Sequence, residues 1–215
     1  MAHHLLLHYK EESFYYIKAR ESLLEQVTTY GAEILCSAGF QSERDFMQHG
    51  ITNCYTHSIC VAYVALRWAQ LLNAKVDVPS LVRGCLLHDY FLYDWHDKEK
   101  AADHHTINHP KVALANAERD FKLNDIERDI IRKHMFPLCF PFPKYKESWI
   151  ITLADKTCAA SEIWHLWSLE NVIAALDRRI QAMLYTPPCP FPMEGAFFVN
   201  VVDLQGQIPL PLHTL

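Results

Sequence analysis

A chain of 215 residues, half of them apolar, is long enough to bury the core of one domain. With only six glycines, it is a poor match to a glycine-rich nucleotide-binding loop or to a turn-dense β-sandwich. The formal net charge of −5 leaves no basic excess for non-specific binding of nucleic acid, although a small basic pocket for one phosphate is compatible with it.

The first half of the chain predicts three helices. A polar–apolar pattern without proline predicts an amphipathic helix over residues 13–38, ending near Gly39. The pair Thr52-Asn53 is a start signal for a second helix, through about residue 72. Pro79 opens a third, which runs through residue 87.

The second half continues in the same way up to residue 184. Pro110 lies where a first-turn proline belongs, so the next helix is predicted to begin there and continue to about Phe121. Asn124 and Asp125 cap another helix, which ends before Pro137. The prolines between residues 137 and 143 predict a loop. Two more helices are predicted at residues 146–166 and 169–184.

These elements predict an all-α fold: a single helical bundle with a proline-rich C-terminal arm. We expect residues 1–50 to form an N-terminal helical extension and residues 51–185 to form the core. Residues 186–215 are expected to be a tail packed on that core, with a short strand or extended arm around residues 197–202.

The cysteines and the N-terminus indicate the compartment. Seven cysteines form no CxxC pair and lie mostly within apolar segments, which predicts buried free thiols in a reducing compartment. The N-terminus has no basic region and too short an apolar run for a signal peptide, and no stretch is suited to span a membrane. We therefore expect a cytoplasmic protein without a membrane partner.

Histidine is the compositional anomaly, with 13 in the chain. His57 shares a predicted helical stripe with Val61 and Val64, so its side chain is expected to face inward. His134 lies on an apolar helix face with Ile131 and is expected to face the core as well. Taken singly, an inward histidine is usually a core residue whose hydrogen bonds are satisfied by the protein.

Two aspartates stand in equally apolar surroundings. His88 and Asp89 interrupt an apolar run, and Asp155 follows another. An ionised carboxylate in such a place is costly to desolvate unless it has a charged or hydrogen-bonded partner. A salt bridge to Lys or Arg would explain Asp155 alone. Several inward histidines and aspartates on different helices are satisfied together by one shared cation, which favours a metal site.

The order of these residues resembles the H…HD…D signature of the HD superfamily. The residues that carry this resemblance are His57, His88, Asp89 and Asp155. The segments Asn108-His109-Pro110 and Ile131-Arg132-Lys133-His134 resemble the added histidines of members that bind two metals. The resemblance covers about residues 51–160. Members of this superfamily are helical metal-dependent phosphohydrolases and phosphodiesterases, with a smaller branch of di-iron oxygenases.

The resemblance implies a first metal held by four residues, namely His57, His88, Asp89 and Asp155. It implies that His109 and His134 supply a second metal, with Asp89 and a water or hydroxide as bridges. Imidazole with carboxylate suits one or two divalent ions of Fe, Mn, Zn, Co or Ni better than Mg or Ca. For His109, simple helix capping or a position in a surface loop is the alternative.

The expected function is metal-dependent phosphohydrolysis of a small-molecule phosphoester, with a metal-bound hydroxide attacking phosphorus. A phosphomonoesterase and a phosphodiesterase are both compatible, and a nucleotide is one candidate substrate. Asp89 and Lys156 are the predicted catalytic residues, and Lys133 and Lys156 the predicted substrate-binding cations; the alternative for each lysine is a solvated helix face.

Departures from the family pattern narrow the range of candidate substrates. The HD pair lacks the following Gly-Lys, and His134 lacks the following Gly-Tyr-Pro, that are typical of cyclic-dinucleotide phosphodiesterases. No glutamate follows Asp89 closely, which weakens the analogy with deoxynucleotide monophosphatases. The alternative functions are a di-iron oxygenase with the same ligands, a non-catalytic HD module that binds a ligand, and a helical binding module with structural histidines. The oligomeric state is left open.

Overall fold

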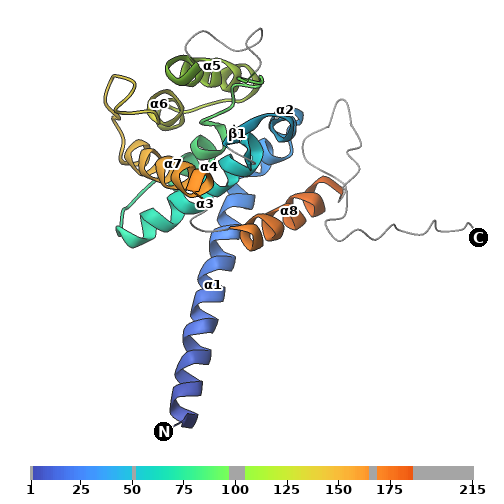
Figure 1. Ribbon diagram of the computed structural model, residues 1–215, viewed down its shortest axis with the longest axis vertical. Coiled ribbons are helices and arrows are strands. Elements are labelled where there is room, and N and C mark those ends of the chain that lie inside the picture. Colours follow the sequence, from blue (N-terminus) through green and yellow to red (C-terminus); the bar gives the residue numbers. More distant parts are fainter. Residues whose placement is uncertain (1, 50–51, 97–104, 165–168, 186–215) are drawn as a thin grey trace, which may run out of the picture.

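A computed structural model describes residues 2–49, 52–96, 105–164 and 169–185 (Figure 1). The expected C-terminal tail, with its strand or arm, lies outside the described residues. The helices are α1 (Ala2–Leu35), α2 (Ala38–Ser42), α3 (Cys54–Leu71), α4 (Val78–Leu87), α5 (His105–Asp120), α6 (Asp125–Lys133), α7 (Lys146–Trp164) and α8 (Glu170–Tyr185). A 3-10 helix, η1 (Glu43–Asp45), and two short strands, β1 (Met47–His49) and β2 (Thr52–Asn53), complete the described elements.

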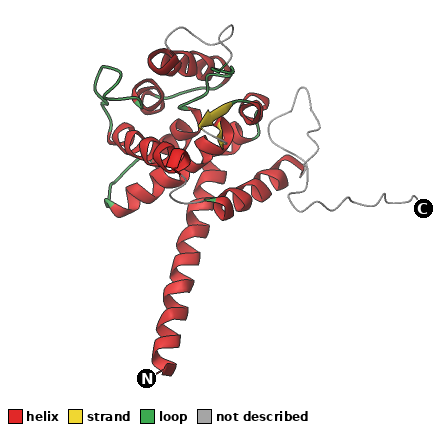
Figure 2. Ribbon diagram, in the orientation of Figure 1, coloured by secondary structure: helices red, strands yellow, loops and turns green. Residues whose placement is uncertain are grey.

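The described chain is mainly helical, as predicted, and Figure 2 shows helices in almost every described segment. The first turns of α1 project away from the other helices, whereas its C-terminal end contacts α3, α4 and α8 (Figure 1). α5 and α6 lie side by side at the opposite end of the molecule from the start of α1. No helix among the described residues is long and apolar enough to cross a membrane.

The core is built around α3. Nearly all side chains in its first four turns are buried, and the helix contacts α1, α4 and α7. A helix that is apolar on all sides is stable only inside a bundle. Each fully buried aliphatic side chain, such as Ile59 or Val61, contributes about 1.5–3 kcal/mol relative to exposure. This burial holds the polar His57 of α3 in the interior.

Three of the predicted helix starts, those of α3, α4 and α6, are confirmed by their caps, whereas the helix predicted from residue 13 begins at Ala2. The Asn53 side chain accepts a hydrogen bond from the backbone N–H of Thr56 at the start of α3. Asn124 and Glu127 form a reciprocal capping box at the start of α6, which satisfies two backbone donors. Asp77 caps α4, and Pro79 lies in its first turn as predicted.

A partly buried guanidinium group links three helices. Arg83 of α4 donates to Glu33 of α1 at 2.7 Å and to Glu127 of α6 at 2.8 Å. Planar guanidinium groups suit such forked contacts with carboxylates. The contacts hold α4 and α6 together, and the C-terminal ends of these two helices carry site residues.

The prediction that Pro110 begins a helix is wrong, because α5 begins at His105 and contains Pro110 in its second turn. Proline has no N–H, so it leaves the carbonyl of Thr106 without its helical donor. Thr106 is exposed in the first turn, where water can hydrate that carbonyl. The proline is therefore tolerated one turn later than the sequence pattern suggested.

The segment between α1 and α3 also differs from the prediction. α1 ends at Leu35, and Ser37 caps the separate helix α2 by accepting from the backbone N–H of Phe40. The strands β1 and β2 pair antiparallel, with Met47 opposite Asn53. Strands of two or three residues are too short to show the alternation by which a strand is predicted.

Substitution of Gly84 tests how closely α4 and α6 must approach. A Cβ at Gly84 would lie 2.6–3.0 Å from three side-chain atoms of Ile130. We expect Gly84→Ala to lower the free energy of unfolding by about 1–2 kcal/mol, because the clash outweighs alanine's better helix propensity. Chemical denaturation measures this change.

Ile130→Ala provides the control for that interpretation, since it removes the two closest atoms. The double variant should lose less stability than the sum of the two single losses. A Gly84→Ala protein more stable than wild type would contradict the close approach.

Candidate metal centre

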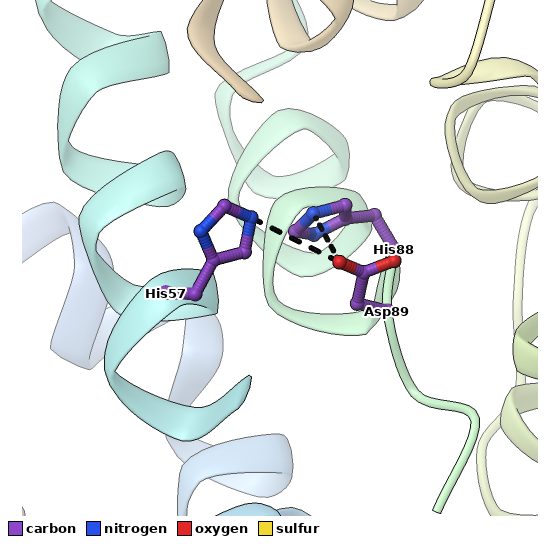
Figure 3. A group of neighbouring side chains, drawn as sticks. All are labelled: His57, His88 and Asp89. Carbon is purple, nitrogen blue, oxygen red and sulfur yellow. Dashed lines mark ion pairs between the residues drawn. The ribbon is translucent and has the colours of Figure 1, made fainter. Parts of the chain in front are cut away.

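Six buried histidine and aspartate side chains meet where five helices converge. They are His57 of α3, His88 and Asp89 at the end of α4, His109 of α5, His134 at the end of α6, and Asp155 of α7. Figure 3 shows the first three of these, with His57 reaching from α3 toward the pair at the end of α4. All of the residues predicted as metal ligands are thus brought together.

Asp89 lies at the middle of the cluster, and its two carboxylate oxygens face different groups. Oδ2 lies 3.3 Å from Nε2 of His88 and 3.8 Å from Nε2 of His57 (Figure 3). Oδ1 lies 3.2 Å from Nε2 of His109 and 3.4 Å from Nε2 of His134. This is the arrangement of a carboxylate that bridges two adjacent sites.

Asp155 completes the first of these groups. Its Oδ1 lies 3.2 Å from Nε2 of His57 and 3.8 Å from Nε2 of His88. Ligand atoms at about 2.1 Å from one cation are about 3.0–3.4 Å apart at octahedral or tetrahedral angles. The spacings around both groups are close to this range, so small shifts would bring each set onto one ion.

Backbone carbonyls orient two of the imidazole rings. His88 and His134 are the C-cap residues of α4 and α6. Their Nδ1 atoms lie 2.7 Å from the carbonyl oxygen of Cys85 and 2.9 Å from that of Ile131. The last carbonyls of a helix have no helical donor, so a ring N–H three residues later is a natural partner.

The remaining two rings also have an oxygen acceptor at Nδ1. Nδ1 of His109 lies 3.0 Å from the carbonyl oxygen of His105, and Nδ1 of His57 lies 3.0 Å from the Glu162 carboxylate. Since carbonyl and carboxylate oxygens only accept, Nδ1 carries the proton in each ring. Nε2 then faces the cluster with its lone pair available, which is how metal-binding histidines are oriented.

The ligand atoms therefore suit a shared cation better than they suit hydrogen bonds with one another. Nε2 of His109 lies 2.9 Å from Nε2 of His134, although both atoms present lone pairs in this tautomer. Nε2 of His88 and Oδ1 of Asp89 are buried without a hydrogen-bond partner. Within each of two groups that share Asp89, all ligand atoms lie within 4.8 Å of one another. These residues are able to hold metal ions.

The charges in the centre point the same way. Burial raises the pKa of Asp89, but the facing histidines outweigh it and hold that pKa well below its usual range. The pKa of Asp155 is likewise lowered by His57 and His88 against the effect of burial. Burial lowers the pKa of His57, but Glu162 and Asp155 raise it to about 10. Protons on the imidazoles thus compensate the negative charge of the buried carboxylates, which is the role that bound divalent ions would take.

Three site residues were missed by the sequence reasoning, and two of them contact the cluster directly. Gln48 of β1 donates its amide N–H to Oδ2 of Asp89 and accepts from the thiol of Cys54 at 3.4 Å. Nothing in a three-residue strand marks this glutamine. Glu162 follows Asp155 by two helical turns on the same face of α7, and this spacing could have identified it.

A third missed residue is Glu43 of η1. Its side chain is fully buried, and neither carboxyl oxygen has a hydrogen-bond partner. Burial raises the pKa of Glu43 well above its usual value, and the charge of Asp89 raises it further. The carboxyl is therefore expected to be protonated well above the pH at which an exposed glutamate ionises.

The two predicted lysines lie beside the centre. Lys156 of α7 donates from Nζ to the carbonyl of His134 at 3.2 Å, and desolvation of its ammonium group lowers its pKa. The ammonium of Lys133 forms an ion pair with Asp129, one turn earlier on α6. Their roles toward a substrate stay predictions.

The fold and the cluster define a helical protein with a buried His/Asp centre able to hold metal ions. Residues 54–160 match the HD domain family, and this region contains every member of the cluster. The chain therefore belongs to the HD-domain superfamily, as its sequence predicted. No curated protein and no solved structure matches the chain.

Glu162 allows the orientation of His57 to be tested. We expect Glu162→Ala to weaken metal binding about 10–100-fold, because His57 loses the acceptor that fixes its ring and raises its basicity. Glu162→Gln should lose less, since the amide oxygen still accepts from Nδ1. Competition with a chelator measures the affinity, and Glu25→Ala, an exposed site on α1, is the control. Unchanged affinity in Glu162→Ala would contradict this role.

Glu43 predicts a pH effect on stability in chelator-treated protein. Because its pKa is raised in the folded state, the folded protein holds this proton more tightly than the unfolded chain. Stability should therefore fall as the pH rises above the unfolded pKa of about 4.3, until Glu43 ionises in the folded state. Glu43→Gln should remove this part of the fall.

The difference in unfolding free energy between wild type and Glu43→Gln, measured by denaturation at several pH values, should therefore increase with pH in favour of the variant. A difference that does not change with pH would show that Glu43 ionises normally.

Proposed function

We propose that this protein is a metal-dependent phosphohydrolase that acts on a small-molecule phosphoester. The observation that carries the proposal is the division of the two Asp89 oxygens between two groups of imidazoles, which suits a two-metal centre. Membership of the HD superfamily supports it, since hydrolysis of phosphoesters is the chemistry that the resemblance implies.

Divalent ions bound there would lower the pKa of a coordinated water and polarise a phosphoryl oxygen. The protein's part is to fix the donors. Asp89 holds the two groups at a constant separation, and the four Nδ1 contacts prevent the rings from turning away. Such preorganisation requires little rearrangement during reaction.

Lys156 is the proposed cation for the phosphoryl group. It follows Asp155 directly, and its ammonium group is already at the edge of the centre through the carbonyl of His134. A hydrogen bond from ammonium to a carbonyl is easily exchanged for a charge-assisted bond to a phosphate oxygen, which is stronger. Lys133, held by Asp129, would have to break an ion pair first.

Asp89→Asn tests the proposal. Elemental analysis of the purified protein identifies the metal, and p-nitrophenyl phosphate and bis(p-nitrophenyl) phosphate then distinguish monoesterase from diesterase activity. We expect the variant to lose metal and to lose activity by about a hundredfold or more, because both groups share this carboxylate. Its helical content should be retained.

Asp125→Asn, at an exposed carboxylate on α6, is the matched control and should keep full activity. Normal turnover by Asp89→Asn would overturn the assignment of the centre. Bound iron with oxygen consumption and no hydrolysis would instead place the protein with the di-iron oxygenases.

A further inference from the structure

A group of large apolar side chains is exposed beside the metal centre. Leu138, Phe140 and Phe142, in the loop between α6 and α7, are 62%, 66% and 61% exposed. Together with the exposed Ile107 of α5 and the exposed Trp149 and Leu153 of α7, they form what we call the apolar rim. Several large apolar side chains exposed in neighbouring segments are typical of a binding site.

Ring contacts join the rim to the centre through Phe136. This residue follows His134 by two positions, and its ring lies 5.9 Å from that of Phe140 and 5.0 Å from that of Phe142, between centroids. It also lies 5.2 Å from the ring of Trp149. The aromatic members of the rim therefore pack around Phe136, which is two residues from a metal-centre histidine.

α7 provides a second connection. Trp149, Leu153 and Lys156 are spaced four and three residues apart, so they share one face of the helix. The amine of Lys156 reaches the carbonyl of His134. The apolar face of α7 thus ends at the cation proposed to bind phosphate.

The metal centre is least covered toward the same side. The side chains of Asp155 and His109 are 10% and 6% exposed, whereas those of the other four members of the cluster are at most 2% exposed. These two residues come from α7 and α5. Ile107 of the rim precedes His109 by two residues, and the thiol of Cys139 donates to the Ile107 carbonyl at 3.6 Å. The loop is thereby attached to α5 on the side where the centre opens.

The loop between α6 and α7 and the adjoining part of α7 expose positive charge. Between residues 130 and 157 the two carboxylates, Glu147 and Asp155, are buried, whereas Lys144, Lys146 and Lys156 are exposed. This local positive charge contrasts with the formal net charge of the whole chain, which is −5. An apolar surface bordered by lysines is complementary to an anion that carries an apolar body.

The chemistry of the loop favours a hydrocarbon body over a nucleobase. Residues 135–143 (MFPLCFPFP) contain one hydrogen-bonding side chain, the thiol of Cys139, and it is already used. Three of the nine residues are prolines, which lack a backbone donor. The loop's side chains therefore offer nothing to read the polar edges of a base, whereas a hydrocarbon chain requires no polar partner.

We propose that the apolar rim binds the hydrocarbon part of an amphiphilic phosphoester whose phosphate enters the metal centre. This rests on the proposed function, because it names the substrate class of the same site. The lysines attract the anionic end, the rim covers the apolar end, and Phe136 and Lys156 lie between the two.

Chain-length dependence of binding tests the rim without turnover. Butylphosphonate and decylphosphonate, below their aggregation concentrations, are titrated into the metal-loaded protein by calorimetry. Each fully buried methylene strengthens binding about fourfold, so we expect decylphosphonate to bind at least about a hundredfold more tightly. Equal affinity of the protein for butylphosphonate and decylphosphonate would overturn the proposal.

A matched pair of double variants locates the effect. Phe140→Ser with Phe142→Ser should weaken decylphosphonate binding about tenfold or more and leave butylphosphonate binding unchanged. Leu71→Ser with Leu72→Ser, at exposed leucines at the other end of α3, should change neither. Loss of decylphosphonate binding in the control, or none in the rim variant, would overturn the proposal.

Hydrolysis separates this inference from the proposed function. Inactivity on butyl phosphate, decyl phosphate and bis(p-nitrophenyl) phosphate alike would overturn the phosphohydrolase assignment. Equal kcat/KM for butyl phosphate and decyl phosphate, which have the same type of leaving group, would leave that assignment intact and overturn the rim's role. A wild-type dimer that the rim variant converts to a monomer, by light scattering, would show that a second copy covers the rim. Rim-dependent binding to phosphatidylcholine vesicles without chain-length dependence would assign it to a bilayer. Either of these results would also overturn the proposal.

Discussion

The structure depends on one buried carboxylate that four imidazoles face. Asp89 is almost fully buried, and an ionised carboxylate in such a place costs several kcal/mol unless positive charge compensates it. The charges that surround it come from four helices that are far apart in the chain. The packing of these helices therefore depends on the charge balance of the centre. A cation at Asp89 would compensate the carboxylate and hold the helices together.

Helix ends do much of the positioning. His88 and His134 occupy C-cap positions, where free carbonyls accept from their Nδ1 atoms and turn Nε2 toward Asp89. Two short elements also contribute. β1 places Gln48 against Asp89, and η1 places the buried Glu43 nearby. Because ligands must give up protons to bind a metal, and the unfolded chain has no preformed site, binding and folding should be coupled in this protein.

The surroundings of the centre are asymmetric in a way that matters for function. On one side of it, the apolar residues of α3 form a closed core, and the Arg83 contacts join α4 to α1 and α6. On the side of α5 and α7, exposed aromatic rings and lysines adjoin the least covered members of the cluster. Exposed rings in water are unfavourable for a protein unless a ligand or partner covers them, so this side is where recognition is expected.

The sequence by itself determined the helical class, most helix starts and the inward positions of His57, His134 and Asp155, because these follow from local rules. Caps depend on neighbouring residues, and inward-facing histidines such as His57 follow from a period of 3.6. The resemblance to the HD family added His109 and the assignment of these residues as metal ligands. Only the tertiary structure decided which Asp89 oxygen faces which imidazoles, and that Glu162 and Gln48 take part. The start of α5 was misjudged because local rules place proline in the first turn, whereas exposure of Thr106 allows it one turn later. Pairings between distant helices leave no periodic mark in a single chain, since they depend on how the helices pack in three dimensions.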